Sequence, residues 1–455
     1  ANVEPSRFDA GTAYIAVDQH HNGDFGAYAY KTSDYGRSWK LVSSGIPSSP
    51  LSFAHFIRED PVRKGMLYLG TDNMLYVSLD DGAHWVSLHN NMPHAPIYWL
   101  QVQEHFSDIV VATYGRGFYI LDDITPLRAL DEAMKSDAFL FEPRSAYRFQ
   151  PVSGIKTGGF GGPGGSNVNG RNPPYGASLN FYAKEAVKNP VEVVISDVSG
   201  KTIRTLKKKA AAGINRVWWN LRHEDVKRPK LRTAPPGRPW VPLGPDGTRP
   251  LVTWDLDLWR GSMGPLAPPG QYIVKVKVGE QELTQTVEIL KDPHSTGSEA
   301  DIQAQVAFTL ELQKDLNDLV RMIDQLEWLR KQIEDLRLMI KEHDAAESIL
   351  AAAKNLEEKA IAVEGKMFDI NLTGAREDAF RGSMKLYGRY NALASDISGF
   401  GADFPPTDQQ IQVHAVLRGR LDEARSEYER LVETDVTSLN SLLQEKQLGG
   451  IAIRH

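Results

Sequence analysis

The stretch Thr32-Ser33-Asp34-Tyr35-Gly36-Arg37-Ser38-Trp39 decides the fold, because it recurs as Ser78-Leu79-Asp80-Asp81-Gly82-Ala83-His84-Trp85. Both copies fit the pattern Ser/Thr-x-Asp-x-Gly-x-x-Trp, and their aspartates lie 46 residues apart. A run of alternating apolar residues, which is typical of a β-strand, precedes each copy. The sequence therefore predicts two similar β units, each containing a tight hairpin turn.

Each residue type in the pattern has an expected structural role. The aspartate accepts backbone N–H groups, the glycine adopts a positive φ, and the tryptophan packs beneath the turn at the start of the next strand. We interpret these positions as structural and not catalytic; they are Asp34, Gly36, Trp39, Asp80, Gly82 and Trp85.

A third copy of the unit is degenerate. Residues 110–113 align with 68–71, and residues 118–123 align with 75–80, but the turn motif is lost. A repeat of this length is typical of a blade of a β-propeller, which usually needs at least four blades to hide its strand edges. We therefore interpret residues 1–127 as the last two to three blades of a propeller. The missing blades are expected upstream in the same precursor or in another chain.

The rest of the chain is expected to contain three further segments, which makes the fold multidomain and mainly β plus α. Residues 128–176, which include the glycine run 157–165, are expected to form a Gly/Pro-rich linker. Residues 177–294 contain about seven short alternating segments, which favour an immunoglobulin-like β-sandwich with an insertion at 223–268. Residues 295–455 are expected to form an α-helical bundle.

The helical prediction rests on apolar residues that recur every three or four positions between Leu312 and Ile340. A capping box is expected at residues 298–301. Further helices are predicted at about 344–365, 377–397 and 405–446. The apolar stripe is expected to form the bundle's own core, with a homo-oligomer through the helices as the alternative.

Composition excludes several classes of partner. The chain of 455 residues has a formal net charge of −6 and well-mixed charged residues, so it lacks the basic character expected of a nucleic-acid-binding protein. No run approaches the roughly 20 apolar residues that a membrane span requires. The chain contains 0 cysteines, which excludes disulfides and thiolate metal sites.

The repeats carry a resemblance to a known family. Residues 30–39, 58–71 and 112–123 resemble the closing blades of bacterial BNR/Asp-box proteins of the sortilin type, which are often labelled glycosyl hydrolases. Residues 172–177, 213–222 and 268–272 resemble the Ig-like module that follows the propeller in these proteins, before a helical tail. The resemblance implies a bacterial extracytoplasmic protein, either periplasmic or secreted, in which about half of the protein lies N-terminal to Ala1.

Ligand contacts are expected in one loop and at one arginine. Residues 18–24 carry two histidines and two carboxylates, Asp18, His20, His21 and Asp24. They form a candidate site for a divalent cation, against the alternative of a solvated loop. Arg116, between two glycines, is expected either to contact an anion in the propeller channel or to brace the final blade. We assign no catalytic residue and no other cofactor, because the arginines of residues 1–125 show no clustered spacing.

Three functions follow from these expectations. The first is an exported non-catalytic binding or scaffold protein, in which the propeller recognises a protein or a glycan. The second is a glycoside hydrolase, similar to sialidases or xyloglucanases, whose catalytic carboxylates lie in blades N-terminal to this chain. The third is a structural subunit of a larger complex.

Overall fold

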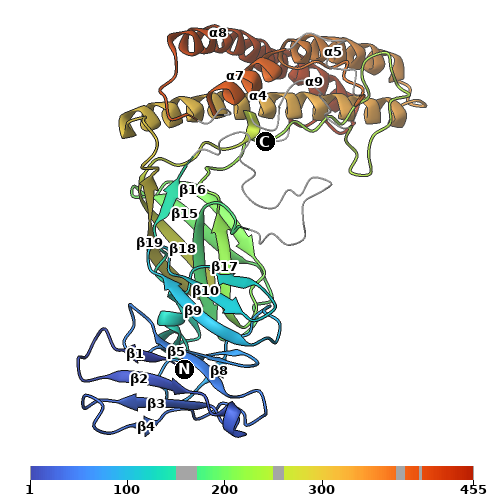
Figure 1. Cartoon of the computed structure of the whole chain (residues 1–455). Coiled ribbons are helices and arrows are strands. Elements are labelled where there is room, and N and C mark those ends of the chain that lie inside the picture. Colours follow the sequence, from blue (N-terminus) through green and yellow to red (C-terminus); the bar gives the residue numbers. More distant parts are fainter. Residues whose placement is uncertain (1, 150–171, 250–260, 376–384, 399–401, 454–455) are drawn as a thin grey trace. The chain divides into compact units, whose positions relative to one another are not determined.

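The structure of the protein is a computed structural model (Figure 1), which describes residues 2–149, 172–249, 261–375, 385–398 and 402–453. The chain divides into two compact units, each built from several segments. The first unit comprises residues 1–146, 156–220 and 270–289, and the second comprises residues 147–155, 221–269 and 290–455. The chain is thus mixed β and α, with a helical C-terminal region, and each unit is described by itself.

The first unit begins with three antiparallel sheets, each of which follows the order of its strands in the sequence. Sheet 1 contains β1 (Val3–Pro5), β2 (Ala13–Val17), β3 (Tyr28–Thr32) and β4 (Lys40–Leu41). Sheet 2 contains β5 (Ala54–Glu59), β6 (Leu67–Thr71), β7 (Leu75–Ser78) and β8 (Val86–Ser87). Sheet 3 contains β9 (Ile97–Gln103), β10 (Asp108–Thr113) and β11 (Phe118–Leu121). The predicted repeat is therefore present as three consecutive sheets, the third without an outer strand.

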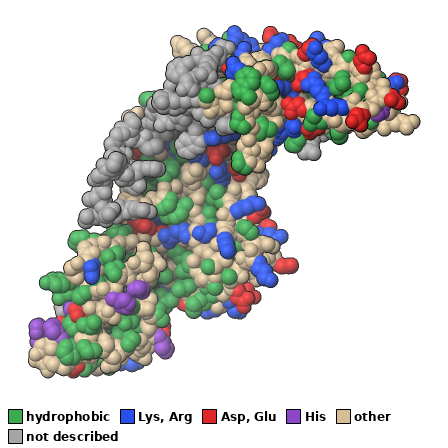
Figure 2. Space-filling model, turned by 90° about the vertical axis from the view of Figure 1, so that its right-hand side faces the viewer, with side chains coloured by type: hydrophobic (Ala, Val, Ile, Leu, Met, Phe, Trp, Pro, Cys, Tyr) green, Lys and Arg blue, Asp and Glu red, His purple; other side chains and the backbone are tan. Residues whose placement is uncertain are grey.

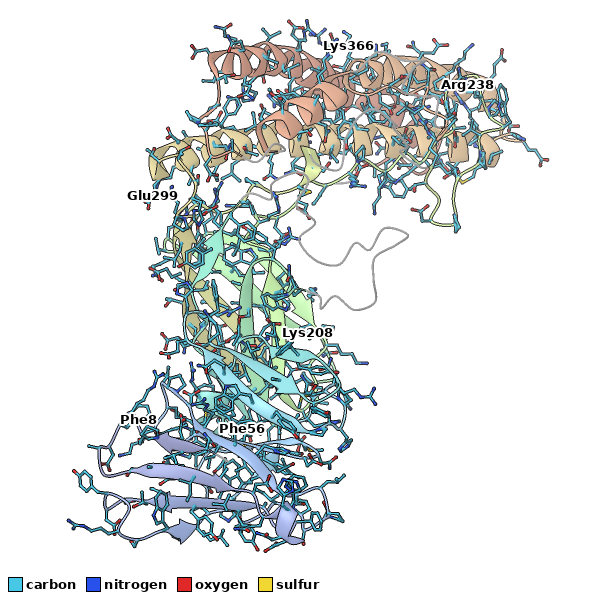
Figure 3. All side chains as sticks on the ribbon, viewed as in Figure 1. Phe8, Phe56, Lys208, Arg238, Glu299 and Lys366 are labelled. Atoms are coloured by element: carbon cyan, nitrogen blue, oxygen red, sulfur yellow. The ribbon has the colours of Figure 1, made fainter. Side chains whose placement is uncertain are left out.

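Two apolar clusters hold these sheets together. Tyr14, Ala16 and Val42 of sheet 1 pack against residues of sheet 2 that include Leu69 and Tyr76. The opposite face of sheet 2 packs against sheet 3 through a second cluster; its residues include Phe56 (labelled in Figure 3), Leu75, Val77, Leu100, Val111 and Ile109. Sheet 2 is therefore covered on both faces, and every residue of β6 is buried.

Two more antiparallel sheets complete the first unit. One has the order β12-β14-β17, from Ala138–Leu140, Ala177–Ala183 and Gly213–Trp219. The other has the order β13-β19-β18-β15-β16, from Ala146–Arg148, Gln281–Lys291, Gly270–Val278, Val191–Asp197 and Thr202–Lys208. The predicted strands at 177–183, 191–196, 202–206, 213–221, 271–278 and 282–290 are thus confirmed within a few residues.

The segment predicted as a linker is only partly described. Residues 128–149 are not a plain linker, because they contain the end of α1 (Thr125–Arg128), α2 (Leu130–Ala133), β12 and β13. The linker prediction was wrong for these residues, which lack the Gly/Pro richness of the later part. The glycine run 157–165 lies outside the described residues.

A buried carboxylate joins the three-sheet stack to strands β14 and β17 of the same unit. Asp123 accepts hydrogen bonds from the Ser178 hydroxyl at 2.5 Å and the Asn180 amide at 2.9 Å. Arg216 donates to the carbonyl oxygens of Asp122 and Asp123 at 2.8 and 2.7 Å. Hydrogen bonds outweigh burial and hold the pKa of Asp123 below its ordinary value, so this carboxylate is charged inside the unit.

The second unit contains the helices α4 (Glu299–Met339), α5 (Ala346–Met367), α7 (Leu386–Ser398), α8 (Asp408–Arg430) and α9 (Thr437–Glu445), with a π-helical turn at Leu431–Val436. The predicted capping box is confirmed, since the Ser298 hydroxyl accepts from the N–H of Asp301, whose carboxylate accepts in return. Lys366 of α5 (Figure 3) pairs with Glu427 of α8 at 2.6 Å. None of the helices in the described part of the chain is long and apolar enough to cross a bilayer.

The predicted apolar stripe of α4 is buried in the bundle's own core. Leu312, Leu316, Leu319 and Ile323 are fully buried, and they belong to one cluster with residues of the other helices. Val226 and Leu231, from the predicted insertion, belong to the same cluster. The insertion therefore packs on the helices within the second unit, although in the sequence it separates two strands of the first unit.

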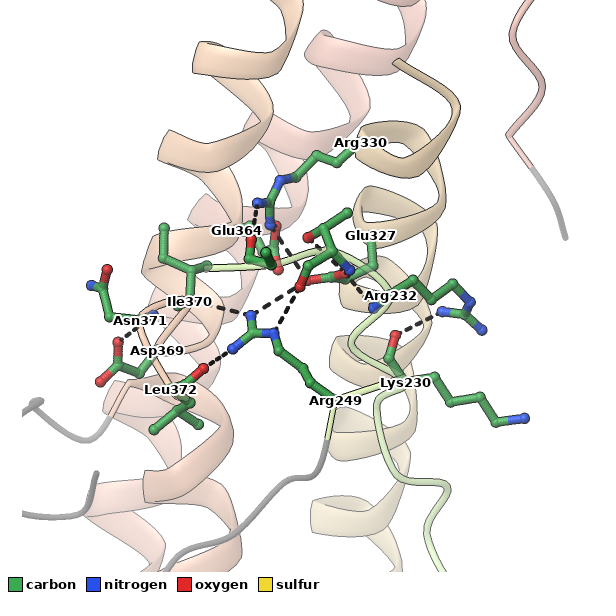
Figure 4. Close-up of polar contacts among 12 residues, drawn as sticks. Lys230, Arg232, Arg249, Glu327, Arg330, Glu364, Asp369, Ile370, Asn371 and Leu372 are labelled. Carbon is green, nitrogen blue, oxygen red and sulfur yellow. Dashed lines mark hydrogen bonds and ion pairs between the residues drawn. The ribbon is translucent and has the colours of Figure 1, made fainter. Parts of the chain in front are cut away.

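A buried charged network attaches this insertion to the helices (Figure 4). Glu327 of α4 accepts hydrogen bonds from the N–H groups of Arg232 and Thr233 at 2.6 and 2.8 Å. Arg330, one turn along α4, donates a hydrogen bond to the carboxyl group of Glu364 of α5 at 2.9 Å. The Arg249 guanidinium lies 3.8 Å from Glu327 and donates to backbone carbonyl oxygens at Thr233, Ile370 and Leu372.

Candidate functional site

The two repeated turns have the same hydrogen bonds. The carboxylate of Asp34 accepts from the N–H of Ser38, and that of Asp80 accepts from the N–H of His84, both at 2.9 Å. The hydroxyl that opens each turn accepts from the glycine N–H, also at 2.9 Å. Gly36 has a φ of 81° and Gly82 a φ of 83°. In both turns the aspartate thus accepts backbone N–H groups and the glycine adopts a positive φ.

The hydrogen bonds of both turns favour the ionised form of the aspartate. The Ser38 hydroxyl and N–H lower the pKa of Asp34 to about 2. For Asp80, burial acts in the opposite direction, but hydrogen bonds from His84 and Ser78 outweigh it and lower the pKa. Both carboxylates are thus ionised near neutral pH and occupied by their own turns, which leaves them no role as a proton donor or as a nucleophile.

The two tryptophans differ. Trp85 is 3% exposed, and its indole N–H donates to the carbonyl oxygen of Val42 in sheet 1 at 2.6 Å. Trp39 lies against Gly36 of its own turn but is 40% exposed. Trp85 is therefore buried and Trp39 is not, because the contact that buries Trp85 comes from the neighbouring sheet.

Because Trp85 is buried and Trp39 is exposed, we expect the same substitution to have different effects on stability at the two positions. Trp85→Phe removes the indole donor from a buried carbonyl, so we expect a loss of about 1–3 kcal/mol in the free energy of unfolding. Trp39→Phe should change this free energy by less than about 0.5 kcal/mol, as for other exposed positions. Urea unfolding of the two variants beside the parent chain measures both values. Equal losses would show that the contact with Val42 does not stabilise the stack.

The residues of the loop 18–24 do not converge on one point. The Oδ1 of Asp18 lies 2.6 Å from Nδ1 of His20 and accepts from its N–H at 3.0 Å. Asp24 accepts from the Tyr28 hydroxyl at 2.8 Å and from the N–H of Gly26. Those contacts lower the pKa of Asp24. Among the described residues, no group of three or more histidine or carboxylate side chains is placed to hold a metal ion.

Arg116 lies in the loop between β10 and β11. The flanking Gly115 and Gly117 have φ values of 80° and 77°, a conformation that glycine adopts at little cost. The side chain is exposed and makes no hydrogen bond or ion pair with the described residues. The expected bracing of the final blade is therefore not observed, and the guanidinium is accessible to a ligand.

A continuous file of aromatic and imidazole rings crosses the loop end of the three sheets. His20 stacks on Phe53 with ring centroids 4.4 Å apart, and Phe53 contacts His55 at 5.2 Å. His55 stacks on Tyr98 at 4.3 Å, and Tyr98 contacts Tyr114 at 5.5 Å. We call these six rings the aromatic file; they are His21, His20, Phe53, His55, Tyr98 and Tyr114.

The aromatic file is exposed at its ends and fixed at its centre. Phe53 is buried, whereas Tyr98 is 49% and Tyr114 70% exposed. His55 is held by Asp72, whose carboxylate lies 3.0 Å from its Nε2. Figure 2 shows histidine and hydrophobic side chains lying close together on the surface of this unit. Exposed aromatic side chains beside histidines and carboxylates make this end of the sheets the candidate binding surface.

Sequence reasoning found one end of this surface and missed the rest. The sequence predicts Asp18, His20 and His21 as contact residues, but it does not predict Phe53 or His55. A signal was present, because His55 and Tyr98 both occupy the second position of the first strand in their sheets, and Asp72 and Tyr114 both follow the second strand. Aligning the repeats for such equivalent loop positions would have brought these residues together.

Three comparisons with known proteins were informative to different degrees. No family model matches the chain, and no curated protein matches it in sequence. Among solved structures, it is similar to an ancestral GH74 enzyme at 13% identity with a TM-score of 0.21, over 63% of this chain and 30% of that one. A chain titled pT26-6p matches at 12% identity with a TM-score of 0.11, over 60% and 48% of the two chains. The chain thus spans less than half the length of either protein.

Proposed function

We propose that the protein is an exported, non-catalytic binding protein whose first three sheets are blades of an Asp-box β-propeller, and that it recognises a glycan along the aromatic file. The observation that carries the proposal is the unbroken series of ring contacts from His21 to Tyr114, supplied by loops and strands of all three sheets. In a propeller the blades surround a central channel, so loops from successive blades lie side by side at one end of the domain.

The chemistry of the surface favours sugars. The C–H faces of a pyranose ring are apolar and flat, so stacking on Tyr98 and Tyr114 removes apolar surface from water. Sugar hydroxyls require charged or polar acceptors at the edge of such a platform. Asp18 and Asp72 supply them, each oriented by a histidine of the aromatic file. Arg116 adds a free guanidinium for an anionic substituent.

The non-catalytic role rests on how the carboxylates are used. Glycoside hydrolysis needs an acid and a nucleophile or base on either side of the scissile bond. Asp18 and Asp72 are each engaged by a histidine, and Asp24 is engaged by Tyr28. Hydrogen bonds to the ionised form lower the pKa of Asp24, and those from His20 outweigh burial to lower the pKa of Asp18, so neither holds a proton for a leaving group.

Substitution of the exposed tyrosines tests the site. Tyr98→Ala and Tyr114→Ala should each weaken binding to the best ligand of an immobilised glycan panel by about tenfold or more, because each removes one stacking platform. Trp240→Ala, at a 73% exposed aromatic of the second unit, is the matched control and should leave binding unchanged. Surface plasmon resonance with the full chain measures the affinities.

The outcomes separate the candidate functions. Hydrolysis of any glycan in the panel by the chain would overturn the non-catalytic role. Binding that survives both tyrosine substitutions would overturn the aromatic file as the site. Binding of polypeptides alone, with no glycan retained, would overturn the ligand class.

Location and assembly complete the proposal. We place the protein outside the bacterial cytoplasm, where cell-surface and environmental glycans are found, and we propose that the remaining blades of its propeller come from polypeptide beyond these three sheets. Fractionation of the producing cells, with detection in the periplasm or medium, tests the location. Recovery of the protein solely with cytoplasmic markers would contradict it.

A further inference from the structure

The second unit contains a small cavity whose wall includes two arginine side chains. They are Arg148, which ends β13, and Arg222, which directly precedes the insertion. The other lining residues belong to the end of the insertion and to α4; they are Pro265, Leu266, Gln305, Val306 and Thr309. All of these residues are part of the second unit. The centre of a water-sized particle can occupy about 10 Å³, so the cavity holds one small molecule or ion.

The Arg148 side chain is buried with one donor unused. Arg148 is 1% exposed, and its Nη1 donates to Oδ1 of Asp403. The other carboxylate oxygen of Asp403, Oδ2, accepts from the Ser295 hydroxyl at 2.7 Å. The Nε–H of Arg148 is also buried, and in the described part of the chain it has no hydrogen-bond partner. Because buried N–H groups are almost always satisfied by protein, water or an ion, we expect the acceptor in the cavity that Arg148 lines.

The rest of the wall combines positive charge with apolar surface. Nη1 of Arg222 donates to a backbone carbonyl oxygen at 2.8 Å, which fixes this guanidinium group in place. The amide of Gln305 and the hydroxyl of Thr309 also donate to backbone carbonyl oxygens, at 3.0 and 2.8 Å. Leu266 and Val306 are apolar and buried. A guanidinium group is permanently charged and has donors but no acceptor, and its attraction for an anion is stronger in such low-dielectric surroundings than in water.

We propose that this cavity binds one small monoatomic anion of the halide class, such as chloride. The Nε–H of Arg148 donates to the anion, and the positive charge of Arg222 stabilises it from the other segment. Phosphate and carboxylate ions are too large for a space that accepts a single water-sized particle. The anion joins three separate segments of the second unit, which are the end of β13, the two ends of the insertion and α4. The inference is independent of the proposed glycan ligand.

The dependence of stability on chloride tests the proposal in solution. The full chain is unfolded in urea with sodium chloride replaced stepwise by sodium gluconate, whose anion is too large for the cavity, at constant ionic strength. Helical circular dichroism reports the second unit. A ligand that binds only the folded state lowers the unfolding equilibrium constant, by about tenfold when its concentration is ten times the dissociation constant. We expect the parent chain to show this decrease as chloride rises.

A variant that fills the cavity separates anion binding from general salt effects. Val306→Ile adds one methylene group to the wall and changes no charge, so it should remove the dependence on chloride. Val320→Ile is the matched control, because Val320 is equally buried in α4 but does not line the cavity. Both variants lose some stability through overpacking. The control should keep the decrease of about tenfold that is expected for the parent chain.

Bromide supplies a direct measurement that needs no variant. In crystals of the full chain grown with sodium bromide, we expect an anomalous scattering peak within hydrogen-bond distance of the Arg148 Nε. A water molecule or empty space at this position, with no anomalous peak, would overturn the proposal. The same holds for a parent chain whose stability ignores chloride, and for a V306I chain that responds to chloride as strongly as V320I.

Discussion

Asp123→Ala is expected to destabilise the first unit by roughly 3–5 kcal/mol, which is the range for removing one partner from a buried charged pair. The substitution leaves the Ser178 hydroxyl and the Asn180 amide without their acceptor, and it leaves Arg216 without the nearest charge, 3.7 Å away. Hydrogen exchange of the peptides that cover residues 172–220, measured in urea, reports this unit by itself.

Two further variants show which property of Asp123 matters. Asp123→Asn keeps an oxygen acceptor and suits the positive φ of 55° at this position, so its loss should fall between those of the alanine variant and the parent. Asp122→Ala removes a neighbouring carboxylate that lacks these partners, and it should cost less than about 1 kcal/mol. If D122A and D123A were equally destabilised, the buried network would not be what joins the stack to β14 and β17.

Glu364→Gln is expected to flatten the pH dependence of stability of the helical unit. Burial, and the proximity of Glu327, raise the pKa of Glu364 to about 8, against the opposing effect of Arg330. The folded unit therefore retains a proton between pH 4.5 and 8 that the unfolded chain releases, so the free energy of unfolding falls as pH rises through this window. The slope is roughly 1.4 kcal/mol per pH unit, and the neutral amide removes it.

Urea unfolding followed by helical circular dichroism at pH 5, 6, 7 and 8 measures the slope. The parent chain should lose stability across the series, and E364Q should lose much less. Glu358→Gln, on an exposed position of the same helix, is the control and should follow the parent. A parent chain whose stability does not fall between pH 5 and 8 would contradict the raised pKa of Glu364.

The repeat was predictable because its determinants are local. Asp34 and Gly36 shape their turn through bonds to residues four or fewer positions away, and the same holds for Asp80 and Gly82. The first turn of α4 was predictable for the same reason, since its capping box lies within residues 298–301. In such segments the donor and the acceptor of each hydrogen bond both lie within the sequence motif.

The remaining features depend on contacts between residues that are far apart in the sequence. Trp39 and Trp85 are identical in local pattern, and only the neighbouring sheet makes one buried and the other exposed. The aromatic file joins His20 to Tyr98 through loops from different repeats. The insertion shows no regular spacing of apolar residues. Its hydrogen bonds to Glu327, about 95 residues away in the sequence, therefore could not be predicted from the sequence.

The interleaving of the two units has a consequence for synthesis on the ribosome. Strand β15 lies between β16 and β18 in its sheet, but about 70 residues separate β15 from β18 in the chain. Because translation proceeds at roughly 5–20 residues per second, the nascent β15–β16 hairpin has an unpaired strand edge for several seconds before β18 is made. Residues 221–249 also lack their packing partner during this time, because α4 has not yet been made. This open edge of β15 is where a newly made chain is most exposed to pairing with the wrong strand.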